Sequence, residues 1–161
     1  KLFDLFVFIA GYKLGFRRGS AVAVMAWLVY GQINPWGVAA PHLIVTLMVA
    51  ETLYAGAGSC ARRLITGSGR FDSSLKTIAV FGVCGLIATG LYDVVTNAYT
   101  GYIWAAFAGS NEYGRWIWIG ITNPGAIFFM AVHVTANIAF FTVFGLPFAR
   151  MTERGLQIFK G

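Results

Sequence analysis

The sequence predicts an all-α protein, a polytopic bundle of transmembrane helices, on three observations. Of the 161 residues, 58% are hydrophobic and 11% are charged, whereas soluble domains carry about 25% charged residues. The mean hydropathy is +0.70. The apolar residues also gather in long stretches, with most lysines and arginines between them. A surface of this composition is too apolar for water, so we expect one integral membrane domain over residues 1–161.

Five apolar stretches are predicted to be membrane-spanning helices. They cover about 2–16, 20–33, 39–61, 75–98 and 117–146. Crossing the hydrocarbon core takes about 20 apolar residues, so the first two stretches are short. They are expected either to tilt or to form a tight hairpin around residues 16–19. Pro124 and Gly125 are expected to break or to start the fifth helix.

The connections between these stretches carry turn signals. Residues 34–37 read Asn-Pro-Trp-Gly, which is typical of a turn. The glycine-rich segment 99–116 is predicted to be a long loop with a short helical piece at 102–107. Asp-Ser-Ser at 72–74 is a suitable start for the fourth helix.

The basic residues predict the orientation. Ten of the 12 lysines and arginines lie in alternate connections and therefore on one side of the membrane. They are Lys13, Arg17 and Arg18, then Arg62, Arg63, Arg70 and Lys76, and finally Arg150, Arg154 and Lys160. The positive-inside rule predicts a multi-pass protein of the cell membrane with that side, and Gly161, in the cytoplasm. Topology thus accounts for the net charge of +6, and we expect no nucleic-acid partner.

A polar group in the fourth stretch is the strongest candidate for a functional site. Asp93 and Asn97 are four residues apart and Thr96 is three from Asp93, so all three share one helix face. An ionisable side chain in lipid costs several kcal/mol unless it is paired or faces water. Such a face predicts either one wall of a substrate pocket or a set of hydrogen bonds that only fixes helix packing.

Three further polar residues lie in the apolar stretches. His133 and Asn137 are four apart in the fifth stretch and are expected to face Asp93, for substrate recognition or for pairing between helices. Glu51 has no basic neighbour in sequence. It is therefore expected to find a partner, to be protonated or to face a wet cavity.

Aromatic residues crowd the predicted outer side of the membrane. They are Tyr30, Trp36, Tyr99, Tyr102, Trp104, Trp116 and Trp118. They fit an interfacial belt or a set of rings that stack on a flat substrate. For the second role we select Trp36 and Trp104, because their predicted loops would be able to close over a pocket.

The sequence contains no motif of an enzyme. It has no Ser-His-Asp order, phosphate loop or dinucleotide fingerprint. Histidines and carboxylates are not at ligand spacing such as HxxxH, and Cys60 and Cys84 form no CxxC pair. We therefore expect no catalytic residue, metal or cofactor. Any ATP hydrolysis that drives transport would take place on another chain.

Four segments, in order, resemble the motifs of one family of membrane proteins. They are Ile9–Ser20, with Leu-Gly before a basic bend; Gln32–Gly37, with Gly, Pro and Trp; Gly90–Asn97, close to Phe/Tyr-Asp-x-x-Thr-Asn; and 133–150, with His, Asn, Gly-Leu-Pro and Arg. Together they span about residues 5–155. The chain resembles the substrate-binding S-component of energy-coupling-factor (ECF) vitamin transporters.

This resemblance implies a six-helix bundle in which the chain supplies helices two to six, with the first helix preceding Lys1. It also implies a membrane coupling subunit and paired ATPases as partners. We expect an outward-opening pocket for a small vitamin-like molecule, lined by Asp93, Thr96, Asn97, Glu51, His133 and Asn137 and roofed by Trp36 and Trp104. The alternatives are a structural accessory subunit of a larger membrane complex and a membrane metalloenzyme subunit.

Overall fold

The computed structural model describes residues 2–33, 37–66 and 74–158, and this part of the chain is helical without a strand. The helices are α1 (Leu2–Leu14), α2 (Phe16–Ile33), α3 (Pro41–Thr66), α4 (Ser74–Phe107), α5 (Tyr113–Thr122) and α6 (Pro124–Ile158). The predicted all-α fold class is confirmed.

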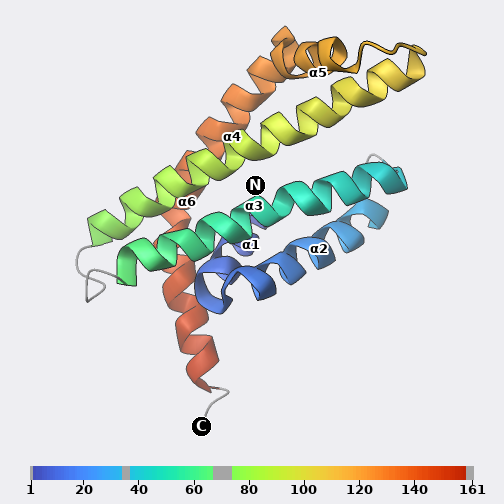
Figure 1. Cartoon of the computed structure of the whole chain (residues 1–161). Coiled ribbons are helices and arrows are strands. Elements are labelled where there is room, and N and C mark those ends of the chain that lie inside the picture. Colours follow the sequence, from blue (N-terminus) through green and yellow to red (C-terminus); the bar gives the residue numbers. More distant parts are fainter. Residues whose placement is uncertain (1, 34–36, 67–73, 159–161) are drawn as a thin grey trace.

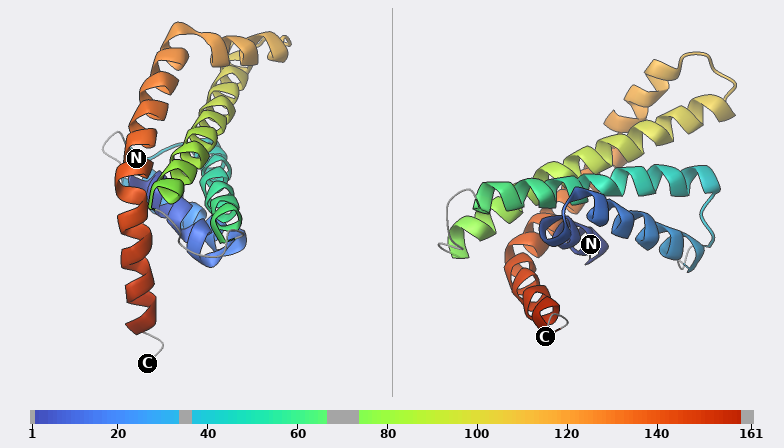
Figure 2. Two further views of the ribbon diagram at one scale, coloured as in Figure 1. Left: turned by 90° about the vertical axis from the view of Figure 1, so that its left-hand side faces the viewer. Right: turned by 60° about the horizontal axis from the view of Figure 1, so that its bottom comes forward.

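The helices form a bundle in which the two long helices α3 and α4 pack against each other. α3 packs against α1, α2 and α4, while α4 also packs against α5 and α6. α1 contacts α2, α3 and α6. Figures 1 and 2 show that α6 crosses the other helices and that its C-terminal end extends beyond them. α1 is short and touches three neighbours, which bury seven of its 13 residues, including Asp4.

The prediction of five membrane spans is wrong for the described helices, of which three are long and apolar enough to cross. These are Pro41–Ile65, Leu75–Phe107 and Pro124–Thr152. α1 has 13 residues and is therefore roughly 20 Å long, against a hydrocarbon core of roughly 30 Å. α2 has 18 residues, but Arg17, Arg18 and Gln32 make it too polar.

The bend between α1 and α2 lies at Gly15 and not at residues 16–19, which belong to α2. Gly15 has φ +86°, a conformation that costs glycine little. The hairpin then closes onto α3 through small residues. A Cβ on Gly11 would clash with the backbone carbonyl of Ala55, and one on Gly19 would lie 2.7 Å from the Gly11 Cα atom. Three backbones therefore approach closely, as small residues permit in membrane bundles.

The predicted loop 99–116 is mostly helical, because α4 continues to Phe107. Gly101 in this segment, like Gly120 in α5, is a packing site, whereas Gly109 has φ +62° and lies in the connection. A Cβ on Gly101 would clash with the carbonyl oxygen of Trp116, and one on Gly120 would clash with that of Asn97. The glycines thus let α5 fold back onto α4, and the remaining connection is residues 108–112.

The expected break at Pro124 is confirmed, since α5 ends at Thr122 and α6 begins at Pro124. The side chain of Asn123 accepts a hydrogen bond of 2.9 Å from the backbone N–H of Ala126. Proline suits the first position of a helix because its missing N–H would have had no partner there. The helix start expected at residues 72–74 falls mostly outside the described residues, because residues 67–73 are not described. Ser74 is the first residue of α4.

We expect the substitution Gly11→Ala to destabilise the bundle, because the added methyl group has no room beside Ala55. Overpacking of this kind costs about 1–3 kcal/mol. Thermal unfolding of the purified protein in detergent, followed by circular dichroism, measures the effect. Gly90→Ala is the matched control, since a Cβ there meets no atom within 4 Å. An equal loss of stability in both variants would contradict the proposed close approach.

Candidate functional site

A buried polar network joins α1, α4 and α6 at the imidazole ring of His133. The Nδ1 atom of His133 lies 2.7 Å from Oδ1 of Asp93, and its Nε2 atom lies 3.1 Å from Oδ2 of Asp4. The exposed fractions are 0% for Asp93, 4% for His133 and 9% for Asp4. The predicted pairing of His133 with Asp93 is therefore present, and Asp4 is a third member.

Asn137 extends the network by one helical turn. Its Nδ2 atom donates to Oδ2 of Asp4 at 2.7 Å, to the Thr89 hydroxyl at 2.9 Å and to the Tyr54 hydroxyl at 3.1 Å. An amide nitrogen carries two hydrogens, so these three acceptors share them. The Tyr54 hydroxyl donates in turn to Thr89 Oγ1 at 3.1 Å. Through Tyr54 the network also includes α3.

The hydrogen bonds are compatible with two arrangements in which the protons of the Asp4–His133–Asp93 group all lie in hydrogen bonds. An imidazolium can donate to two carboxylates, whereas a neutral imidazole donates once and accepts once from a protonated carboxyl. In either arrangement the three side chains carry one negative charge between them. A charge inside the bundle is costly unless it is compensated, so this group favours a cation or hydrogen-bond donors nearby.

Three oxygen atoms around this group have no hydrogen-bond partner within the described residues. They are Oδ2 of Asp93, Oδ1 of Asn137 and Oε1 of Glu51, all inaccessible to water. Buried acceptors without partners are rare in native proteins and each calls for an explanation. All three oxygens accept and do not donate when the carboxyls are ionised, so a ligand rich in N–H or O–H groups would satisfy them.

Glu51 has a hydrogen-bond partner, which is one of the three possibilities that the sequence left open. Its Oε2 atom accepts a hydrogen bond of 3.0 Å from the indole nitrogen of Trp27 on α2. Glu51 is 1% exposed, and it lies one turn before Tyr54 on α3, which contacts Asn137. Glu51 therefore belongs to the same buried region, although no direct hydrogen bond to the network is described.

Two of the predicted site residues on α4 lie apart from this network. The Thr96 hydroxyl turns back to its own helix and donates to the carbonyl oxygens of Tyr92 and Asp93, at 3.0 and 3.2 Å. Asn97 is half-buried, and its backbone lies beneath Gly120 of α5. Among the described contacts, neither side chain reaches His133.

The structure describes only one of the two tryptophans that were expected to roof a pocket. Trp36 lies outside the described residues. Trp104 lies on α4 and not on a loop, and it is 41% exposed. A side chain on a continuous helix cannot close over a site as a loop would, so the geometry expected for Trp104 is wrong.

Asp4, Tyr54 and Thr89 are members of the network that were not predicted from the sequence. Asp4 had a usable signal, because it is an acid inside an apolar stretch, as Asp93 is. Tyr54 and Thr89 had none, since a single hydroxyl in an apolar helix commonly bonds its own backbone. Thr89 does so as well, donating to the Gly85 carbonyl at 2.8 Å.

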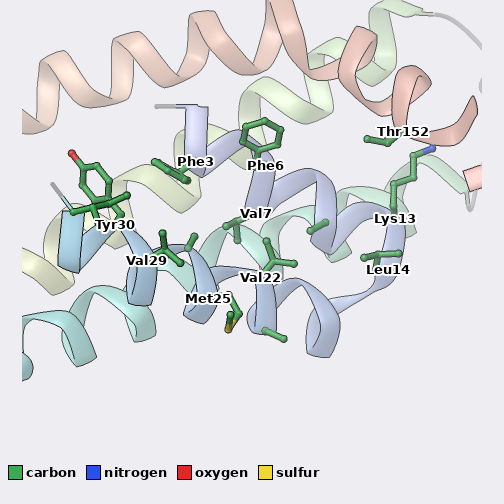
Figure 3. Close-up of a pocket in the computed structure, with 14 residues that line it drawn as sticks. Phe3, Phe6, Val7, Lys13, Leu14, Val22, Met25, Val29, Tyr30 and Thr152 are labelled. Carbon is green, nitrogen blue, oxygen red and sulfur yellow. The ribbon is translucent and has the colours of Figure 1, made fainter. Parts of the chain in front are cut away.

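An apolar groove lies between α1 and α2, with a volume of about 860 Å³ (Figure 3). None of the predicted site residues lines it. The polar network is packed among helices elsewhere. The described residues also contain no group of three His, Cys, Asp or Glu side chains suited to a metal ion.

No family model, curated protein or solved structure matches the chain. The site is therefore defined by its own geometry, a buried Asp–His–Asp group with three acceptor oxygens that lack partners.

We expect His133→Ala to destabilise the protein strongly, because it leaves the Asp4 and Asp93 carboxyls buried without their shared partner. Removing one member of a buried charged pair costs about 3–5 kcal/mol. Chemical unfolding in mixed micelles, followed by tryptophan fluorescence, would measure it. Thr96→Ala is the control and should change stability by well under half of that amount. A His133→Ala protein as stable as the wild type would show that the network contributes little.

Proposed function

We propose that this chain is the substrate-capture subunit of an ECF-type ATP-driven importer, with a small vitamin-like molecule as substrate. The observation that carries the proposal is the buried Asp4–His133–Asp93 group, with its residual negative charge and nearby acceptor oxygens. The ordered motifs that resemble the S-component family support the same assignment. Coupling and ATPase subunits would be separate chains.

The chemistry of the network limits the substrate class. The acceptors without partners are two carboxyl oxygens and one amide oxygen, so the preferred solute carries hydrogen-bond donors and is neutral or cationic. Tyr92 stands perpendicular to the His133 ring at a centroid distance of 5.8 Å. It would add an aromatic surface for a flat ring.

Access to the network requires motion, because Asp93 and Asn137 are both 0% exposed. The helices that carry them, α4 and α6, pack against each other. Capture would therefore require these helices to part on the outer side, and a bound solute would replace the contacts that close the network. We also propose that the basic α1–α2 turn and the C-terminus lie on the cytoplasmic side.

The second candidate is a structural accessory subunit of a larger membrane complex. The complete burial of Asp93 and Asn137 favours it, since hydrogen bonds sealed between helices also serve to fix their packing. In that case the network needs no solute, and the exposed apolar faces would contact other subunits.

A co-purification experiment separates these two functions. Under the capture proposal, mass spectrometry of the gently purified protein should show one small polar molecule per chain. Under the accessory proposal it should show other membrane subunits and no such molecule. Absence of any stoichiometric small molecule, together with no binding from a panel of water-soluble vitamins in titration calorimetry, would reject capture.

For a vitamin that binds, we expect Asp93→Asn to weaken affinity by about 2 kcal/mol, the cost of a lost charged hydrogen bond. Titration calorimetry on protein whose fold is verified by circular dichroism provides the measurement. Glu112→Gln is the matched control, because Glu112 lies on the exposed surface beside Arg115. Unchanged affinity of the Asp93→Asn protein would place the solute elsewhere.

A further inference from the structure

The groove between α1 and α2 is apolar along its length but basic at one end. Apart from Lys13, Tyr30 and Thr152, each of its 14 lining residues is apolar. Its volume of about 860 Å³ lies within the range of roughly 300–1,000 Å³ that small-molecule sites occupy. The groove is a separate feature from the polar network, because the lining contains no member of that network.

The basic end is at the turn between the two helices. Figure 3 shows Lys13 at one end of the groove and Phe3 with Tyr30 at the other. Arg17 follows two residues after Gly15 and is exposed. The guanidinium group of Arg62 on α3 donates to the Lys13 carbonyl at 3.3 Å, which brings a third cation to the same end.

The first turn of α2 adds to this positive charge. It contains Arg17 and Arg18 and no acidic residue. Basic residues are disfavoured at a helix N-terminus, where the helix dipole is already positive. An anion bound at this turn would compensate both the side chains and the dipole, so the arrangement is complementary to a negatively charged group.

The length of the groove fits one leaflet of a bilayer. Phe3 and Lys13 are ten residues apart on α1, or about 15 Å at roughly 1.5 Å per residue. This is about half of a hydrocarbon core of roughly 30 Å. At the far end the Phe3 and Tyr30 rings meet, with their centroids 5.5 Å apart, and they bridge α1 to α2. This contact limits how far an occupant extends beyond the groove.

We propose that this groove binds one anionic phospholipid, with an acyl chain between α1 and α2 and the headgroup at Lys13 and Arg17. The apolar lining matches the chain, and the basic turn matches the phosphate and any further negative charge of the headgroup. The exposed fractions of Val22, Met25 and Val29, which are 37%, 59% and 54%, show that the groove is open along its side. A lipid would therefore enter laterally from the bilayer.

Native mass spectrometry of the full chain in detergent tests this proposal. The protein is stripped of lipid and titrated with phosphatidylglycerol or phosphatidylcholine that carry the same acyl chains. We expect one phosphatidylglycerol to be retained in preference to phosphatidylcholine. In the double variant Lys13→Gln/Arg17→Gln the affinity for phosphatidylglycerol should fall by roughly fivefold for each charge removed. Arg115→Gln, which removes a charge on α5, should leave it unchanged.

A second pair of variants tests the apolar part. Val22→Trp fills the groove and should abolish retention of phosphatidylglycerol, whereas Leu28→Trp, on the same helix but outside the lining, should not. Equal retention of the two lipids, or a preference that survives Lys13→Gln/Arg17→Gln, would overturn the proposal. So would a membrane protein that co-purifies in the groove and leaves no lipid bound in the wild-type complex.

Discussion

The contact on which the structure depends most is the imidazole of His133 between the carboxyls of Asp4 and Asp93. It joins the first and last helices of the chain to α4, across 129 residues in sequence between Asp4 and His133. In a bundle with an apolar interior, the directional contacts that fix helix order are few. A group that is costly when left unpaired penalises other arrangements of these helices. The same group also provides the chemistry from which we infer the function.

Sequence reasoning predicted the helical membrane fold and part of the network, for identifiable reasons. The four-residue spacing of His133 and Asn137 and the isolated acid Asp93 placed polar atoms at depths where lipid offers no partner. These residues were therefore expected to contact one another inside the bundle. The Trp27 partner of Glu51 was not predictable, because the indole nitrogen donates from a helix whose rotation depends on the Gly15 bend. Thr96 lay on the predicted face but satisfied its hydroxyl on its own helix.

Two of the errors in the helix assignment share one physical cause. Glycine is ambiguous in a membrane protein, since it signals a loop in water and a close helix contact in lipid. Gly101 was interpreted as part of a loop, but it lies where α4 touches α5, opposite Gly120. The same ambiguity placed the first bend one to four residues late. The first two apolar stretches were also counted as spans, although α1 is too short and α2 is too polar to cross.

The contact of α1 with α3 has a mechanical consequence. Gly11 meets Ala55, and Gly58 meets Phe8, through main-chain atoms that have no rotamers to change. The seam between α4 and α6 is built differently, since the rings of Phe81 and Phe141 fit over Gly145 and Gly85. A rearrangement that parts α4 from α6 would therefore displace side-chain rings, whereas one that parts α1 from α3 would separate main-chain atoms in direct contact.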